Sequence, residues 1–526
     1  MKKIFAFLSF VAIITLSGCN KDFLDTTSTQ SVSGVSIFAD SEKAMTAVNG
    51  MFREFYMNGW GSGWDHENGG LPAYILAQDL MGEDHLMDAY GSGWFYEDYR
   101  FGVLADYTSN AGRQYHVWNF YYTVICNANY IIAYEDNLEG DPDYYNYVMG
   151  QAYAVRSFAY MMLVQSFQQN GGAEGSAARS LPGVPLYNEP TVAGSKGKGR
   201  GTVQDVYEQA NADIDKAIAY LSASSLTQLH KSHISLAVAY GIKARHALVQ
   251  QDFDTALEAA QEAMKGQSIG SWDDIKTVND VNKKNVLWGL AIQTDQAIGN
   301  AGIFAHMDAD SKNTYSKARH LIANWLYDEI PDTDARKAWW TAPLPEAEWG
   351  TAGSASGSKR SWCQKKLVFT DAASNLGDHI LMRTEELYLI AAEASCEKGD
   401  FVAARNYLKA IGTKRDSGYE ARLAQKLDDK TLNSNTVGAI STLMDEIFFQ
   451  RRVELWGEYP RLLDLQRRGL CYDRAWEGTN HTATCSAYTS KPGSANFIWM
   501  IPHSEFDGNE SLNEETDQNP GQGKGL

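Results

Sequence analysis

Charged and apolar residues alternate closely between Gln450 and Gly469, and no other stretch restricts the fold of this chain as much. Residues three and four positions apart lie side by side on a helix, so opposite charges at that spacing can form ion pairs. The predicted pairs are Arg451–Glu454, Glu458–Arg461 and Arg461–Asp464. Because apolar residues lie between the charges, we expect a solvated or half-buried network that holds helices together.

Glu454 and Glu458 also allow a second interpretation, because paired carboxylates act as general acid and base in glycoside hydrolysis. A carboxyl group that donates a proton needs a raised pKa. The neighbouring arginines lower the pKa of both carboxyl groups instead, which favours a structural role. Pro460 lacks a backbone N–H and predicts that one helix bends or ends there.

The N-terminus has the organisation of an export signal. Two lysines precede an apolar stretch, Ile4 to Leu16, that is too short to span a bilayer. Small residues then lead to Cys19, an order similar to the bacterial lipobox, in which the cysteine is lipidated. These features predict a lipoprotein signal peptide over residues 1–18 and a lipidated tether over residues 19–36. An ordinary secretory signal that ends near a cysteine is the alternative.

The charge of the chain limits its partners. The sequence has 65 acidic and 46 basic residues, for a formal net charge of −19. Removal of residues 1–18 takes away two lysines and changes this charge to −21. A nucleic-acid partner needs a basic footprint, so we expect none. An acidic surface favours neutral or cationic ligands.

Five cysteines remain after the signal peptide is removed. They are Cys126, Cys363, Cys396, Cys471 and Cys485. An odd number cannot all pair within one chain, and no C-x-x-C spacing indicates zinc or redox chemistry. Cys471 and Cys485 could close a short surface loop, whereas Cys126 and Cys396 lie in apolar helical patterns that predict buried thiols.

Helical periodicity dominates residues 37–56, 114–265 and 376–470. Within these ranges we expect helices over residues 150–168 and 232–250, a helix that starts at the N-cap candidate Ser41, and a helix over residues 203–221 capped by Thr202. Two stretches, 251–260 and 399–408, combine an aromatic residue at a turn with small alanines, an order similar to the second helix of a tetratricopeptide repeat. Such a helix pair buries its apolar face only by stacking on a neighbouring pair. The pattern predicts two tetratricopeptide-like helix pairs.

Two loop-rich insertions, residues 57–107 and 266–375, interrupt the helices. Gly-Ser-Gly-Trp occurs twice in the first insertion, and half of the 14 tryptophans lie in the second. Sugars present apolar C–H faces and hydroxyl edges, so flat aromatic rings beside polar groups bind them. The predicted ligand-binding residues are Trp60, Trp64, Asp65, Trp94, Tyr96, Tyr99, Trp339 and Trp340. For each aromatic residue, the alternative is that it packs its loop onto the helices.

No motif indicates catalysis or a cofactor. The chain lacks the H-E-x-x-H zinc motif, the G-x-S-x-G nucleophile turn and the dinucleotide fingerprint. The glycine-rich segment 194–201 lacks the lysine and serine or threonine that end a phosphate loop, so it predicts a flexible basic loop. Asn279, Asp280 and Asn282 lack the glycine and glutamate of a calcium loop. We therefore expect no enzymatic activity, no catalytic residue, no cofactor and no metal.

Five segments share a likeness to one protein family. They are Lys21–Asp25, Leu181–Leu186, Arg383–Ala394, Gln450–Gly469 and Ile501–Gly521. Together they resemble the motifs of the SusD/RagB family, nutrient-binding lipoproteins of the Bacteroidetes outer membrane. The chain departs from the family pattern at Tyr459, where glycine is usual, and at Gln522, where tyrosine is usual.

The resemblance implies a lipoprotein of the outer membrane that faces the cell exterior and carries palmitate or similar acyl chains on Cys19. Such a protein captures a glycan, or in some members a peptide, and passes it to a SusC-like TonB-dependent transporter. The resemblance further implies that the body, residues 37–526, is all-α dominated. It would combine a tetratricopeptide-like helical-repeat scaffold with a loop-rich ligand-binding subdomain and end in a C-terminal segment, residues 471–526.

The likeness also places Arg383, Glu386 and Glu393 on one helix face, where interhelical ion pairing is their expected role.

Two other functions of the protein stay open. One is a glycoside hydrolase lipoprotein that uses a carboxylate pair, which the release of new reducing ends from a polysaccharide would support. The other is a helical scaffold that binds no ligand.

Overall fold

The structure is a computed structural model. It describes residues 37–57, 66–88, 94–109, 112–170, 177–311, 318–433 and 437–520. Helices make up most of the regular structure in these segments, and the strands are short. The predicted all-α fold class is confirmed.

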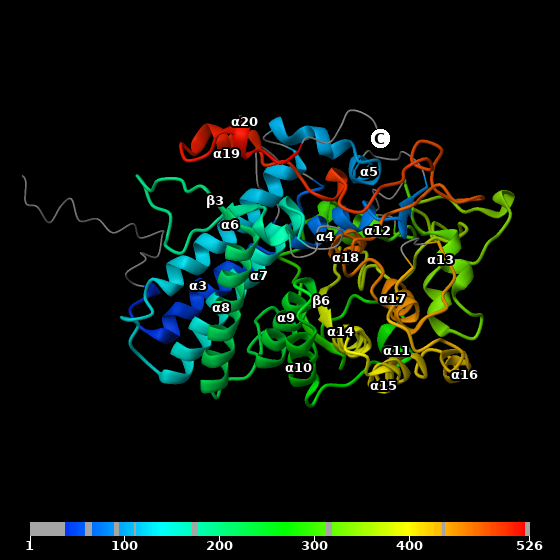
Figure 1. Cartoon of the computed structure of the whole chain (residues 1–526), viewed down its shortest axis with the longest axis horizontal. Helices are drawn as coiled ribbons and strands as arrows, with labels where there is room; N and C mark the ends of the chain where they lie inside the picture. Colours follow the sequence, from blue (N-terminus) through cyan, green and yellow to red (C-terminus); the bar gives the residue numbers. More distant parts are fainter. Residues whose placement is uncertain are drawn as a thin grey trace, which may run out of the picture.

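The long helices follow one another across the molecule (Figure 1). The first group is α3 (Ser41–Arg53), α6 (Arg113–Ile132), α7 (Pro142–Phe167) and α8 (Val203–Ala223), in which α7 contacts the other three. The second group is α9 (Leu236–Val249), α10 (Phe253–Met264), α14 (Thr384–Glu397) and α15 (Phe401–Gly412). Here α10 packs against α9 and α14, and α14 packs against α15, so the two predicted repeat units are neighbours in space.

The turns of these two units have the same geometry. Asp252 and Asp400 cap α10 and α15, and each carboxylate accepts a hydrogen bond from the backbone N–H of the third helical residue. The residue before each cap, Gln251 or Gly399, has a positive φ of 59° or 79°. Glycine adopts this left-handed conformation without steric cost. The shared Asp-Phe sequence after this residue is therefore a true repeat of structure.

Small side chains set the spacing between the repeat helices. Ala244 and Ala247 of α9, Ala256 and Ala260 of α10 and Ala391 of α14 are buried in one cluster. Alanine lets helix backbones approach closely because its side chain ends at Cβ. This cluster explains why α10 contacts both α9 and α14.

Shorter elements build the loop-rich part. Its helices are α4 (Leu71–Leu80), α5 (Tyr96–Tyr99), α11 (Trp272–Ile275), α12 (Ile303–Met307) and α13 (Asn324–Glu329). The 3-10 turns are Gly102–Thr108, Gly299–Ala301, Ala335–Trp339, Glu346–Glu348 and Ala495–Phe497. In the described segments, strands form three antiparallel pairs: β1 (His85–Met87) with β5 (His320–Ile322), β2 (Pro182–Pro185) with β3 (Arg200–Thr202), and β4 (Val286–Leu290) with β6 (His379–Arg383). The β1–β5 pair joins the two insertions, and β4–β6 places the second insertion against the start of α14.

The C-terminal third contains the remaining helices. They are α16 (Tyr419–Leu423), α17 (Leu443–Glu454), α18 (Arg461–Arg468), α19 (His503–Gly508) and α20 (Glu514–Asp517). The predicted break at Pro460 is confirmed, because α17 ends before it and α18 begins directly after it. In Figure 1, α19 and α20 lie beside β3 and α6.

Several helix starts differ from the prediction. The cap of α3 is Asp40 rather than Ser41, and α7 begins at Pro142 rather than near residue 150. Helix α9 begins after Ser235 rather than at residue 232. Thr202 caps α8 as predicted, in a capping box with Asp205.

The predicted signal peptide, the tether and Cys19 lie outside the described residues, so the division of the chain into these parts stays a prediction. Among the described helices, none is both long enough and apolar enough to cross a bilayer.

Candidate ligand-binding site

Glu454 lies at the centre of a buried network of ion pairs. Its carboxylate accepts hydrogen bonds from Arg336 and Arg383 at 3.0 Å and from Arg415 at 3.3 Å. Burial acts to raise the pKa of Glu454, but the three guanidinium groups outweigh it and hold this pKa well below its ordinary value. The carboxylate therefore stays ionised and does not suit the role of a general acid.

Glu458 is bound in the same manner. One carboxylate oxygen contacts Lys366 Nζ at 2.6 Å, and the other accepts from Arg383 Nε at 2.7 Å. Burial opposes ionisation, yet the two cations lower the pKa of Glu458. Neither member of the predicted carboxylate pair has the raised pKa that proton donation requires.

The partners in this network differ from those that helical spacing predicted. Arg451 pairs with Asp464 at 2.6 Å, not with Glu454. Arg461 pairs with Glu83 of the first insertion at 3.0 Å. The break at Pro460 separates only Glu458 from Arg461. Arg451 and Glu454 share α17, and Arg461 and Asp464 share α18, so the partners of these residues are set by the segments packed against the two helices.

Glu386 and Glu393, which lie on α14 with Arg383 at its start, also bind other elements. Arg245 of α9 pairs with Glu386, and Arg467 of α18 binds Glu393 at 2.7 Å. The network therefore joins helices that are far apart in the sequence.

Three of the predicted ligand-binding residues, Trp60, Trp64 and Asp65, lie outside the described residues. Trp94 is half-buried and stacks on the ring of His66, with ring centroids 4.6 Å apart. His66 in turn lies 3.3 Å from His306 of α12, measured between ring nitrogens. Trp94 thus retains a partly exposed face, and a contact between Trp94 and ligand stays a proposal.

Tyr96 and Tyr99 of α5 pack inward. Tyr99 is fully buried, its hydroxyl lies 2.8 Å from His481 Nδ1, and burial raises its pKa. Tyr96 is 8% exposed and contacts Tyr99 edge to face at 5.9 Å. Helix α5 therefore presents little aromatic surface to a ligand.

Trp339 and Trp340 belong to the core, with exposed fractions of 1% and 2%. Trp339 donates a hydrogen bond to the carbonyl of Ile275 at 2.8 Å, and Trp340 meets Trp456 edge to face at 5.6 Å. The expected surface platform at these two positions is corrected to a packing role. The physical reason is that a large aromatic ring removes more apolar area from water in the core than on the surface of a loop.

A hollow of about 680 Å³ lies where α3 meets the loops of the second insertion. Its walls are Asn49, Phe52, Arg53 and Tyr56 of α3 and the turn after it, residues 229–232, and Val281, Asn282, Leu290, Ala291, Gln293, Gln296 and Asp378. In the sequence, Tyr56 lies four residues before Trp60 and directly before the start of the first insertion at residue 57. The hollow therefore adjoins the first insertion as well as the second.

The rim of this hollow is held by hydrogen bonds. The carboxylate of Asp378 accepts from the backbone N–H groups of Val281 and Ile292, each at 3.0 Å. Lys231 Nζ donates to the carbonyl of Val286 at 2.7 Å, and burial lowers the pKa of this lysine. These bonds fix the loops before any ligand arrives, which reduces the entropy cost of binding.

The side chains of the hollow suit a polyhydroxyl ligand. Asn282, Gln293 and Gln296 offer amide groups that donate and accept hydrogen bonds, and Arg53 adds a cationic donor. Tyr56 supplies an aromatic ring, and burial raises its pKa, so it is neutral at physiological pH. Sequence reasoning missed the hollow because its walls come from separate segments. The position of Tyr56 at the border of an insertion was the only available signal.

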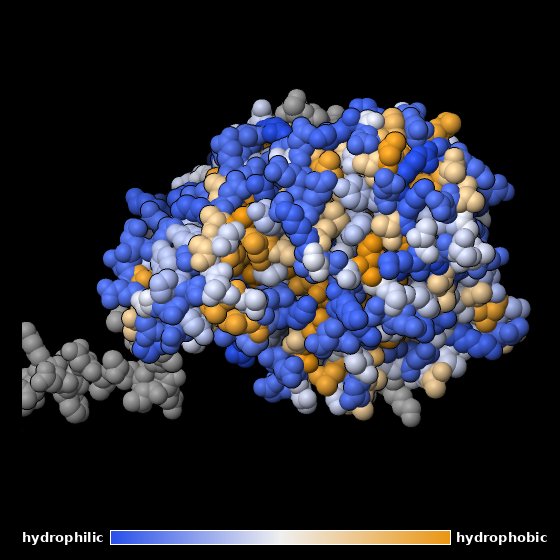
Figure 2. Space-filling view, turned by 90° about the horizontal axis from the view of Figure 1, so that it is seen from below, coloured by the Kyte–Doolittle hydropathy of each residue, from blue (hydrophilic) through white to orange (hydrophobic). Residues whose placement is uncertain are grey.

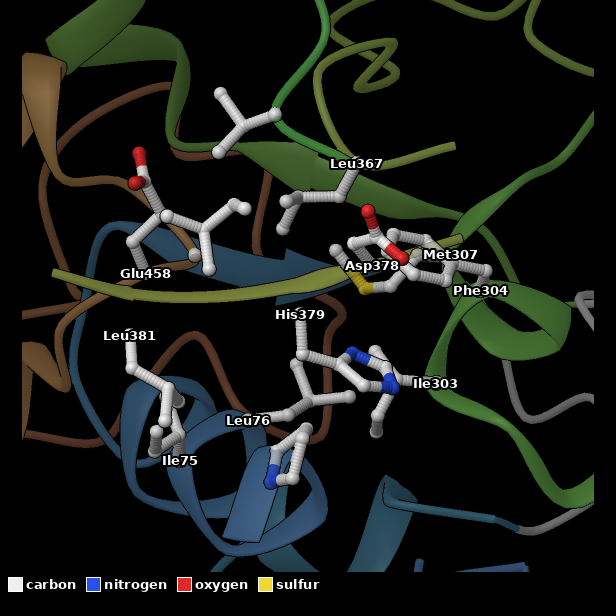
Figure 3. A pocket seen from close by; sticks show the side chains of 14 residues that line it. Ile75, Leu76, Ile303, Phe304, Met307, Leu367, Asp378, His379, Leu381 and Glu458 are labelled. Carbon is white, nitrogen blue, oxygen red and sulfur yellow. The ribbon is translucent and has the colours of Figure 1, made fainter. Parts of the chain in front are cut away.

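A smaller cavity of about 40 Å³ lies between α4, α12 and β6 (Figure 3). Ile75, Leu76 and Met307 line it, and the ring of His379 stacks on Phe304 with centroids 5.1 Å apart. Burial lowers the pKa of His379 to about 4, so this ring is neutral. The cavity holds a few water molecules at most and is too small for a sugar.

The described residues contain no group of three or more histidine, cysteine, aspartate or glutamate side chains that could hold a metal ion. In this part of the chain Cys471 and Cys485 are not joined, so the loop between them is not closed by a disulfide. Cys396 is buried as expected, whereas Cys126 is half-buried.

Comparisons with known proteins agree with this architecture. A profile of SusD-like proteins described as starch-binding and associating with the outer membrane matches residues 75–248. The profile of the SusD family matches residues 353–521. A comparison with curated proteins finds no match.

Solved structures share the fold over nearly the whole chain. A SusD-like carbohydrate-binding protein from Bacteroides vulgatus is 23% identical, with a TM-score of 0.73 over 90% of this chain and 98% of the other. A SusD superfamily protein from Bacteroides thetaiotaomicron is 21% identical, with a TM-score of 0.71 over 91% and 100%. A laminarin-binding SusD-like protein is 19% identical, with a TM-score of 0.64 over 92% and 99%. Both matching profiles describe SusD proteins, and together they match more than half of the chain, so this chain belongs to the SusD/RagB family.

Proposed function

We propose that this protein is a glycan-binding lipoprotein of the cell surface. It captures an oligosaccharide or polysaccharide and delivers it to a partner TonB-dependent outer-membrane transporter. The observation that carries the proposal is the hollow beside α3, which combines the ring of Tyr56 with amide side chains in a volume of about 680 Å³. That volume lies within the roughly 300–1,000 Å³ of small-molecule sites.

Family membership supports the same function. One matching profile is described as starch-binding and associating with the outer membrane, and one structural relative binds laminarin. In this proposal Cys19 carries the lipid anchor, and Trp94 extends the aromatic surface toward the first insertion. Trp60, Trp64 and Asp65 remain candidates for the same surface.

The proposal includes no bond cleavage. Glu454 is fully buried, and both Glu454 and Glu458 are bound to cations that lower their pKa, so neither carboxyl group suits the role of a general acid. Incubation with a polysaccharide panel is expected to release no reducing ends. New reducing ends would revive the hydrolase alternative.

Calorimetric titration of the purified protein with neutral polysaccharides, their oligosaccharides and peptides tests ligand capture. We expect saturable binding of one glycan class. Tyr56→Ala is expected to weaken it at least tenfold, because the variant removes the aromatic ring from the hollow. Tyr144→Ala is the matched control, since Tyr144 is also half-buried but lies on α7 outside the hollow. Equal affinities of the two variants would place the glycan elsewhere.

Trp94→Ala in the same titration tests the extended surface. An affinity loss with an unchanged melting temperature supports a contact between Trp94 and the glycan. Normal affinity would exclude Trp94 from the site. Binding of peptides alone would change the ligand class, and no binding at all would favour the scaffold alternative.

Co-purification of a TonB-dependent transporter with this protein from membranes tests the delivery step.

A further inference from the structure

A second pocket, of about 280 Å³, lies on the helical scaffold. Its walls come from α6, from residues 187–197 and from α19, which Figure 1 shows beside one another. It shares no lining residue with the hollow beside α3. The two sites are therefore independent in structure.

Aromatic rings in fixed positions form one wall of this pocket. Tyr122 meets Tyr187 edge to face at 5.7 Å. Behind these two rings, the buried ring of Trp118 is tilted against Tyr122 at 4.9 Å. The hydroxyl of Tyr122 donates to the carbonyl of Pro185 at 2.8 Å, and the hydroxyl of Tyr187 accepts from the backbone N–H of Lys198 at 3.1 Å. Because these bonds hold the rings, the wall needs no rearrangement to receive a ligand.

A half-buried carboxyl group, that of Glu505, lines the pocket beside these rings. Glu505 accepts a hydrogen bond from Trp118 Nε1 at 3.0 Å and from Asn509 Nδ2 at 2.8 Å. Burial raises the pKa of Glu505 despite these two bonds, which indicates poor access of water to the carboxyl group. Each carboxyl oxygen keeps a further lone pair for a hydroxyl donor.

The glycine-rich segment 194–201 closes the pocket on the third side. A side chain at Gly197 would collide with the amide of Asn509, so only glycine lets this loop approach α19 so closely. Ser195 and Lys196 are exposed at the mouth and add a hydroxyl and an ammonium group. The segment that resembled a phosphate loop in composition is thus the rim of a pocket.

We propose that this pocket is a second binding site and takes a neutral monosaccharide or disaccharide. The volume lies at the lower end of small-molecule sites, which suits one or two sugar rings. The partly exposed rings of Tyr122 and Tyr187 match the C–H face of a sugar, and Glu505, Asn119 and Ser195 match its hydroxyl edge. An anion would face the Glu505 carboxyl group without a buried cation to offset it. A purely apolar ligand would leave these polar groups unpaired.

Saturation-transfer NMR with glucose, galactose, mannose, maltose and laminaribiose tests the site. Tyr56→Ala protein is used, so that the hollow beside α3 contributes little signal. At least one sugar is expected to give a signal with the Tyr56→Ala protein. This signal is expected to disappear in the double variant that also carries Asn119→Trp, because the tryptophan side chain fills the pocket from α6. No sugar signal in the Tyr56→Ala protein, or a signal that survives Asn119→Trp in a folded double variant, overturns the proposal.

Alkylation of Cys126 gives a second readout, because this half-buried thiol lines the pocket. Peptide mass spectrometry follows its reaction with iodoacetamide, and Cys471, the other half-buried thiol, is the internal control. The sugar that binds is expected to slow alkylation of Cys126 at least fivefold and leave Cys471 unchanged. Equal rates with and without sugar, or protection by inorganic phosphate instead, contradict a neutral sugar site.

Discussion

Glu454 is the carboxylate on which three arginines converge, from the second insertion, the start of α14 and the segment after α15. Its exposed fraction is zero. A buried ion pair affects the free energy of unfolding mainly when one partner is removed, because the other charge then remains buried without a partner. The residue that first suggested catalysis is therefore a structural centre.

Replacement of Glu454 by glutamine tests that role. We expect Glu454→Gln to reduce the free energy of unfolding by about 3–5 kcal/mol, since three buried guanidinium groups lose their shared anion. Urea denaturation measures the change. Glu420→Gln is the control, because the Glu420–Lys409 pair is exposed and contributes little. A stable Glu454→Gln protein would contradict the structural assignment.

Asp464 predicts a pH dependence of stability. Burial acts to raise its pKa, but Arg451 and Arg467 outweigh it and lower the pKa to about 2. The unfolded chain has an aspartate pKa of about 3.9. A lowered pKa in the folded state means that the stabilisation is complete above about pH 4 and is lost as pH falls toward 2.

The test compares wild-type protein with Asp464→Asn in urea between pH 7 and pH 3. The difference in unfolding free energy is expected to be constant from pH 7 to about pH 5 and to narrow below pH 4. A difference that does not change with pH would show that Asp464 is not stabilised as an anion.

Helix packing depends on close approach at a few positions. Gly150 of α7 faces α8, where Leu221 leaves no room for a methyl group, because a Cβ atom would lie 2.6 Å from Leu221 Cγ. Among the described helices, α7 and α8 share the most extensive contact. Glycine in a helix interior normally costs about 1 kcal/mol relative to alanine, so its use here reflects packing.

Gly150→Ala and Gly50→Ala make a matched pair of variants. Gly150→Ala is expected to destabilise the protein by about 1–3 kcal/mol, because overpacking outweighs the better helix propensity. Gly50 lies on α3 with no atom near the position of a Cβ, so Gly50→Ala is expected to stabilise by about 1 kcal/mol. Thermal unfolding measures both. If both variants change the stability in the same direction, helix propensity rather than packing determines the effect at Gly150.

At the level of helices, much of the fold could be predicted from the sequence. Helices α10 and α15, the Thr202 cap and the break at Pro460 depend on neighbours within one or two turns, and all lie where expected. The start of α7 was missed because the residues before Gly150 carry many tyrosines and charges, so their apolar periodicity is weak.

The chain as a whole is acidic, and the face in Figure 2 is mainly hydrophilic, with groups of apolar residues between polar ones. The chain carries a formal net charge of −19. A field of one sign repels ligands of the same sign at low ionic strength and is screened by salt.

This charge predicts a preference among glycans. Whichever neutral glycan binds, its sulfated derivative is expected to bind at least tenfold more weakly in 20 mM salt, with a smaller difference in 500 mM salt. Calorimetry at both salt concentrations measures the effect. Tighter binding of the sulfated form would show that cationic groups at the site outweigh the net charge.

The sequence by itself determined the helical class and the repeat units, because helical periodicity and capping act between close neighbours. It indicated an ion-pair network around Glu454 but not Arg336, Arg415 or Lys366, which come from other segments. Only the tertiary structure decided that Arg451 pairs with Asp464, that Arg461 pairs with Glu83 and that Trp339 and Trp340 are buried. It also formed both pockets. The reason is physical: ion-pair partners, burial and cavities arise where segments distant in sequence meet, and no local pattern records which segments those are.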